Sequence, residues 1–325
     1  MGIEPTLSTQ LGALEHGAGL LSPAETGLVR ISGPKHREAL QRVLSQDVVN
    51  LKPGQGSLGL LLAAKGQFRA IMAVFVGAEE SYLLAPGGRE AELSRSLRPY
   101  LVLSRCTVEP VPARALAVVG AGWREGAAAA GADVPALAAG GWIERVGVLW
   151  FGRTTLGVPG VFAVAGEGEP EALAAVDQAV RAVGAALVSA EAVNLERIRT
   201  GFPAWGAELT ETVLPPEVGI EAETISYTKG CFIGQETIAR MKTYGHPNRC
   251  LVGLHQTGGD VERPAVPSPL VPVGEDRARG SLTSWGRHPA LGGVALGLVK
   301  RELAGPGSRF TGAGCEFEVT PLPIW

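Results

Sequence analysis

Residues 58–85 read LGLLLAAKGQFRAIMAVFVGAEESYLLA, three apolar runs separated by the short stretches KGQ and AEES. Short runs rich in Leu, Val, Ile and Phe, bounded by turn-forming residues, are typical of strands that follow one another along the chain. The stretch therefore predicts a β-meander, which makes an antiparallel sheet the basis of this part of the fold.

The segment before the meander predicts a strand followed by a helix. In residues 27–33, GLVRISG, Val29 and Ile31 fall on one face of the strand because side chains alternate along it. Pro34 is expected to open the next helix, since its fixed φ angle suits a first helical turn. Apolar residues then recur at helical spacing, at Leu40, Val43 and Leu44.

Helical spacing returns in residues 89–101 and in residues 169–187. The second segment carries an apolar stripe against a polar back, formed by Leu173, Val176, Val180 and Val183. We expect these two helices to cover one face of the sheet.

The character of the sequence changes after Arg249, where short apolar runs alternate with Gly and Pro clusters. This pattern predicts a small antiparallel β-barrel at the end of the chain. A chain of 325 residues is long enough for about two domains. We therefore expect an α+β protein divided into residues 1–245 and residues 246–325.

The amino-acid composition and the net charge argue against two kinds of partner, nucleic acid and membrane. The chain has 46% hydrophobic residues, 19% charged residues and a net charge of -3, which argues against disorder and against nucleic-acid binding through overall positive charge. Its first residues lack a basic segment followed by an apolar core, and no apolar run approaches the ~18 residues of a spanning helix. We expect a cytoplasmic protein without a membrane partner.

The four cysteines lie far apart along the chain, at Cys106, Cys231, Cys250 and Cys315. None belongs to a CxxC pair, so the spacing predicts neither a preformed zinc or cluster site nor a disulfide framework.

Cys231 stands in the unusual stretch KGCFIGQETIAR, residues 229–240, between two glycines and next to Lys229. The glycines allow a sharp turn, and a helix is expected to follow. The partial positive charge at that helix N-terminus, together with Lys229, would favour the thiolate, while Glu236 opposes this. The pattern indicates a reactive or metal-touching thiol. The alternative is a small packed side chain, as most free cysteines are.

The same stretch resembles the KGC(F/Y)xGQE motif of the YgfZ family. These proteins are folate-binding relatives of the glycine cleavage T-protein that support maturation or repair of iron-sulfur proteins. Residues 45–75, 197–240 and 282–301 are similar to further blocks of the family, so the resemblance covers nearly the whole chain.

The resemblance implies a T-protein-like folate-binding region of two α/β subdomains, followed by the C-terminal antiparallel β-barrel. The three lobes would enclose a central cavity that binds tetrahydrofolate. Related aminomethyltransferases carry a GGIxDD block where this chain reads KGQFRAI, with Arg69 and Ala70 in place of the carboxylates. They also carry DFIGxE where this chain has Cys231. The expected acid/base group is missing, so glycine cleavage activity is not expected.

The resemblance also suggests where folate would be held. The family usually has a glutamate at the position of Arg199, and Arg199 could instead pair with the glutamate tail of folate. Lys65, Arg240 and Arg249 are further candidates for carboxylate contacts. Taken singly, such basic residues are more often solvated.

The leading hypothesis is a folate-dependent accessory factor that uses Cys231 in iron-sulfur cluster assembly or repair. Lys229, Gln235 and Glu236 would shape the surroundings of the thiol. Cys231 would act as a redox thiol or as a transient metal ligand shared with an iron-sulfur protein or the assembly machinery. One alternative is a tetrahydrofolate-dependent one-carbon transferase acting on tRNA. Another is a non-catalytic folate-binding scaffold.

Overall fold

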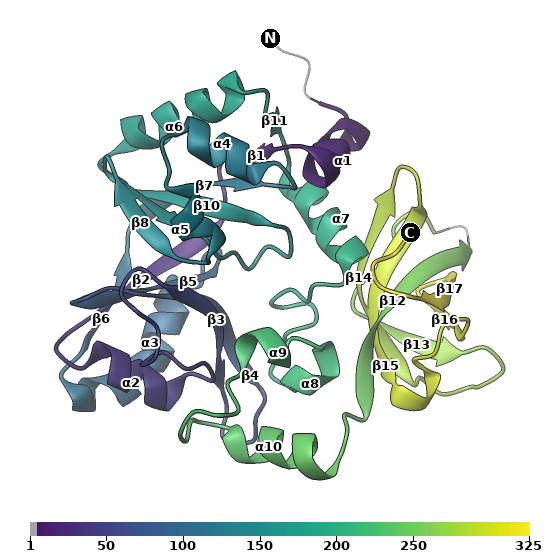
Figure 1. The fold of residues 1–325 in the computed structure, drawn as a ribbon. Coiled ribbons are helices and arrows are strands. Elements are labelled where there is room, and N and C mark those ends of the chain that lie inside the picture. The colour runs from purple at the N-terminus through teal and green to yellow at the C-terminus, as the bar shows by residue number, and fades with distance from the viewer. Residues whose placement is uncertain (1–4, 260) are drawn as a thin grey trace.

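The computed structural model describes residues 5–259 and 261–325, which form three lobes (Figure 1). Two lobes are each built on a β-sheet with helices on one face, and the third is a barrel. The predicted α+β class is confirmed.

The first lobe contains the predicted meander. Its sheet has the order β3-β4-β5-β2-β6, with antiparallel neighbours throughout. The strands are β2 (Thr26–Ser32), β3 (Gly56–Leu62), β4 (Phe68–Val76), β5 (Glu80–Pro86) and β6 (Thr107–Val111). The helical segments are α2 (His36–Val43), α3 (Glu90–Leu101) and η1 (Val102–Ser104).

The predicted strand-then-helix unit is present with shifted helix limits. Val29 and Ile31 are buried and pack in one cluster with residues of α2 and α3. Helix α2 begins two residues after Pro34 because Lys35 takes a non-helical conformation with φ -125° and ψ 29°. Leu44, predicted within the helix, lies just after it in extended conformation.

The second lobe is a six-stranded sheet of order β11-β1-β7-β10-β9-β8. Its strands are β1 (Gly19–Leu21), β7 (Ala113–Val119), β8 (Trp142–Arg145), β9 (Val148–Phe151), β10 (Gly160–Gly166) and β11 (Ala186–Leu187). Its outer face is covered by α4 (Trp123–Ala129), α5 (Val134–Ala138) and α6 (Pro170–Ala182).

The expectation that two helices cover one sheet is wrong. Helix α3 packs on the five-stranded sheet and α6 on the six-stranded sheet, because each sheet has its own apolar outer face to bury. In α6, Val176 and Val180 are buried as predicted, whereas Val183 follows the helix end and is exposed.

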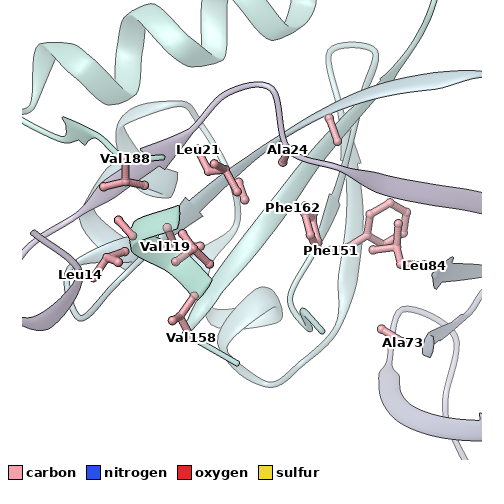
Figure 2. Packing of buried hydrophobic residues seen from close by; sticks show 14 of the residues in the cluster. Leu14, Leu21, Ala24, Ala73, Leu84, Val119, Phe151, Val158, Phe162 and Val188 are labelled. Carbon is pink, nitrogen blue, oxygen red and sulfur yellow. The ribbon is translucent and has the colours of Figure 1, made fainter. Parts of the chain in front are cut away.

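The inner faces of the two sheets share one hydrophobic cluster (Figure 2). The rings of Phe75 and Phe151, one from each sheet, lie 4.7 Å apart between centroids. Helix α1 (Leu7–His16) and helix α7 (Ala190–Thr200) also contribute buried residues to this cluster. The two lobes are therefore joined by an apolar core.

The third lobe is the predicted antiparallel barrel, closed in the order β12-β15-β14-β13-β16-β17. Its strands are β12 (Arg249–Gly258), β13 (Ser268–Pro272), β14 (Gly280–His288), β15 (Gly292–Lys300), β16 (Arg309–Gly312) and β17 (Cys315–Thr320). The turn η2 (Arg301–Leu303) follows β15. Before the barrel, the chain passes through α8 (Pro215–Val218), α9 (Glu221–Thr224) and α10 (Gln235–Tyr244). The boundary at residues 245 and 246 remains our proposal. Within the described ranges, no helix has the length and apolar character that crossing a membrane requires.

A buried ion pair connects α7, the turn that follows it and the barrel. Arg197 Nη1 lies 3.1 Å from Glu208 Oε2, and their side chains are 6% and 0% exposed. Ser284 of β14 donates its hydroxyl to Glu208 Oε1 at 2.6 Å and accepts from Arg197 Nη2 at 2.9 Å. Burial lowers the pKa of Arg197, and the carboxylate of Glu208 opposes that effect. The barrel is thus fixed to α7 by charges that water does not screen.

Removing one partner of this pair should destabilise the protein. Glu208→Ala leaves the Arg197 guanidinium buried without its counter-ion, which typically costs about 3–5 kcal/mol of unfolding free energy. Glu211→Ala is the control, because Glu211 pairs with Arg69 at 3.5 Å in an exposed setting, where a pair is worth about 0–1 kcal/mol. Denaturant unfolding would measure both. Equal losses would contradict the role of the buried pair.

Candidate functional site

A cavity of about 590 Å³ lies between the two sheets, α7 and the turn after α7. This volume is in the range of small-molecule sites, about 300–1,000 Å³. Strands of both sheets contribute to its walls, which are largely apolar, through Leu21, Ile71, Pro86 and Leu187. The barrel contributes none of the described lining residues, so the expectation that all three lobes enclose the cavity is wrong. The barrel acts indirectly, through Ser284 and Arg197.

Arg197 reaches the cavity wall, but its N–H groups already have partners. Besides Glu208 and Ser284, it donates to the Phe202 carbonyl at 2.8 Å and twice to Asn194 Oδ1 at 3.0 Å. A guanidinium has five N–H groups, and these five bonds use them all. Arg197 therefore holds the wall in place and leaves ligand contacts to its neighbours.

Three neighbours give the cavity its recognition chemistry. Glu25 is exposed and is the single acidic residue among the described lining residues. Asn194 projects from α7, and the Trp205 indole forms part of the wall with the Arg89 guanidinium 4.6 Å from its ring centroid. A carboxylate, a carboxamide and a broad aromatic face suit a planar heterocycle with hydrogen-bonding edges.

Cys231 is exposed and is not among the lining residues of the cavity. The next residue, Phe232, is buried in a separate hydrophobic cluster and anchors this segment. Gly234 has φ +83°, and a Cβ there would lie 2.5 Å from the Ala63 carbonyl oxygen. The thiol is therefore presented to solvent on a segment packed tightly against the turn between β3 and β4.

Lys229 is buried, and its ammonium is occupied by backbone carbonyls. Nζ donates to the carbonyl oxygens of Gln41 and Leu44 at 2.5 Å and of Gln46 at 2.9 Å, at the C-terminal end of α2. Burial lowers the pKa of Lys229 to about 8, and Asp47 partly opposes that effect. Lys229 thus fastens the Cys231 segment to the first lobe.

The other residues of the motif make local contacts. The Gln235 side chain accepts a hydrogen bond from the Phe232 backbone N–H at 3.3 Å, which stabilises the turn before α10. Glu236 and Arg240 form an exposed ion pair at 3.1 Å on α10. Lys65 is exposed beside Gly66, where an added Cβ would lie 3.2 Å from Ile238 Cδ1 of α10.

Two predicted folate-binding arginines have carboxylate partners inside the protein. Arg199 forms two hydrogen bonds with Glu196, at 2.8 and 2.7 Å, and lies 4.4 Å from the ring centroid of Trp325. Arg249 forms two with Glu217, at 2.7 and 2.8 Å. These bonds raise the pKa of each arginine. Lys65, Arg199, Arg240 and Arg249 all lie outside the described cavity lining, and their folate contacts remain predictions.

Sequence reasoning did not single out Glu25, Asn194, Trp205 or Glu208. Trp205 and Glu208 belong to the block of residues 197–240, so that block was a usable signal for them. Glu25 and Asn194 had no local signal, because only the packing of distant segments brings them to one cavity. Within the described residues, no group of three or more His, Cys, Asp and Glu side chains could hold a metal ion.

Comparisons with known proteins support the resemblance. No protein-family model matches the chain. The protein named tRNA-modifying protein YgfZ of Cronobacter sakazakii is 30% identical over 254 residues, covering 75% of this chain and 73% of that protein. An aminomethyltransferase of Rubrobacter xylanophilus is 28% identical over 305 residues, covering 90% of this chain and 79% of that protein. The crystal structure of glycine cleavage system aminomethyltransferase T from Bartonella henselae matches with a TM-score of 0.85 at 22% identity, covering 98% of this chain and 89% of that chain.

The molecule therefore has the T-protein fold, with a ligand-sized cavity between its two sheets and a separate exposed thiol. Within that class, the chain belongs to the YgfZ family.

The burial of Lys229 predicts a pH-dependent stability. Its folded-state pKa of about 8 lies below the 10.5 of a free lysine, so the folded chain loses this proton first as pH rises. As pH rises from about 8 to 10.5, the unfolded chain still holds this proton while the folded chain has lost it. Over this range, the free energy of unfolding of the native protein should rise relative to that of Lys229→Met, by up to about 1.4 kcal/mol per pH unit. Denaturant unfolding on both sides of pH 8 would measure the difference, with Lys65→Met as a control for charge. A difference that does not change with pH would contradict it.

Proposed function

We propose that this protein is a folate-dependent accessory factor for iron-sulfur cluster assembly or repair. The observation that carries the proposal is the cavity of about 590 Å³ in a T-protein fold that also presents a fixed, exposed Cys231. Tetrahydrofolate would occupy the cavity, and the thiol would act on a partner protein.

The residues present fit a folate. The cavity walls are largely apolar, as its aromatic rings require, and Trp205 offers a broad face for one of them. The Glu25 carboxylate can accept hydrogen bonds from the N–H groups of the pterin, in place of the family glutamate replaced by Arg199. When bound, tetrahydrofolate supplies a carrier for one-carbon units. The chain's own part is to exclude water and orient the ring.

The thiol supports a role outside the cavity. Cys231 is solvent-exposed, whereas Lys229, Phe232 and Gly234 on either side of it are buried and fixed. An anchored thiol of this kind can reach a cluster or a disulfide on another protein without unfolding the segment. We therefore assign Cys231 the reactive role, Lys229 and Gln235 the role of holding its segment, and Glu236 the role of shaping the surroundings of the thiol.

One observation favours a second candidate, a tetrahydrofolate-dependent one-carbon transferase that modifies tRNA. The position of the transferase carboxylates holds Arg69 here, which pairs with Glu211 at the surface. Glu25 supplies a carboxylate in the cavity, and such a group could serve as the acid/base that transfer needs. The Cronobacter relative is named a tRNA-modifying protein, which motivates tRNA as the acceptor.

Calorimetric titration with tetrahydrofolate tests the cofactor. The native protein should bind, and Trp205→Leu should weaken binding by about tenfold because the aromatic face is lost. Trp325→Leu is the control, since Trp325 is 76% exposed and lies outside the described cavity lining. Absence of binding by the native chain would overturn the folate proposal, and recovery in Arg199→Glu would show that the family glutamate had been essential.

Cell-based complementation tests the thiol. Cys231→Ser should fold and bind tetrahydrofolate as the native chain does, yet lose support of iron-sulfur enzyme activity. Cys250→Ser is the control: Cys250 is half-buried in β12, and this variant should still support iron-sulfur enzyme activity. Glu25→Gln separates the candidates, because the carboxamide keeps an acceptor oxygen for the pterin but cannot exchange a proton. Loss of tRNA modification with folate binding retained would favour the transferase. Full enzyme activity with Cys231→Ser would exclude the thiol role.

A further inference from the structure

Asn194 lies on the face of α7 that borders the cavity. Ala190 and Arg197, one turn of helix away on either side, and the adjacent Val193 line the same wall. The Asn194 side chain is solvent-exposed, although most of its helix is buried, because it opens into the cavity. It is therefore positioned to meet whatever the cavity holds.

The orientation of the Asn194 carboxamide is fixed by Arg197. Its Oδ1 accepts from Nε and from Nη2 of Arg197, both at 3.0 Å. Only the oxygen of a carboxamide can accept these bonds, so the Nδ2 group must point the other way. No acceptor among residues 5–259 and 261–325 takes a hydrogen bond from Nδ2. Because Asn194 is exposed and lines the cavity, the two N–H groups of Nδ2, which have no acceptor in the described part of the chain, are available to a ligand there.

Arg197 cannot readily turn to release the amide. Glu208 and Ser284 hold its other nitrogen atoms in the buried network, together with the Phe202 carbonyl. The donor in the cavity is thus set by a network that extends to the barrel. A ligand that approaches Asn194 therefore meets the N–H donors of Nδ2, because Oδ1 is already occupied by its two bonds from Arg197.

From this geometry, we propose that Asn194 is the specificity-determining donor of the cavity and binds the ring carbonyl oxygen of a 4-oxo pteridine. The inference rests on the proposed function, in which the cavity binds tetrahydrofolate. A pteridine with an amino group at position 4 would place its N–H donors against the N–H donors of Asn194, which is unfavourable. The cavity should therefore bind 4-amino analogues more weakly.

The test compares tetrahydrofolate with its 4-amino analogue by calorimetry on the full chain. Asn194→Asp is the informative variant, because a carboxylate still accepts both Arg197 bonds while the N–H donors disappear. Its thermal midpoint should therefore be no lower than that of the native protein. Asn248→Asp adds the same charge at an exposed position outside the described cavity lining and is the matched control.

The native protein and Asn248→Asp should bind tetrahydrofolate at least about tenfold more tightly than the 4-amino analogue, as expected for one hydrogen bond and one avoided repulsion. In Asn194→Asp, tetrahydrofolate affinity should fall about tenfold and the preference should reverse. An unchanged preference would overturn the inference and leave folate binding intact. If Asn194→Asp weakens the binding of both pteridines equally, Asn194 contributes only to the shape of the cavity, and the inference is also overturned. Absence of binding to either pteridine by the native chain would overturn the proposed function and this inference together.

Discussion

The ion pair between Arg197 and Glu208 is the interaction on which the arrangement of the lobes and the cavity depends. Its two charges are almost wholly withdrawn from water, a state that is costly unless every group around them is paired. That requirement fixes α7, the turn carrying Trp205, and β14 through Ser284. A surface pair would tolerate movement of its partners, whereas this buried pair does not.

The same network links structure to recognition. Because the donors of Arg197 are taken up inside the protein, Arg197 orients Asn194 instead of contacting a ligand. Glu25 and Asn194 are therefore the lining residues that we expect to contact the polar edges of a ligand. The barrel, which contributes no described lining residue, still influences the cavity through one serine hydroxyl.

The segment around Cys231 is built differently: Cys231 is exposed, whereas Lys229 and Phe232 on either side of it are buried and fixed by contacts with the rest of the protein. Lys229 is fixed by carbonyl oxygens of the first lobe, and Phe232 is buried in a cluster of its own. Gly234 allows the backbone to approach the β3–β4 turn more closely than any side chain permits. The KGQ turn (residues 65–67) and the KGCFIGQE motif (residues 229–236), which lie far apart in the sequence, thus support one exposed sulfur atom.

The sequence by itself determined the meander, the closed barrel, the α+β class and the YgfZ relationship, because strand periodicity, turn residues and the KGCFIGQE motif are local patterns. It also singled out Cys231 and the residues around it as a candidate site, which remains a prediction. Only the tertiary structure decided that the helices are divided between two sheets, that Arg199 and Arg249 are paired with Glu196 and Glu217, and that Glu25 and Asn194 meet at the cavity. The physical reason is that a charged side chain takes whichever partner the packing of distant segments brings within reach, and no local pattern encodes that choice.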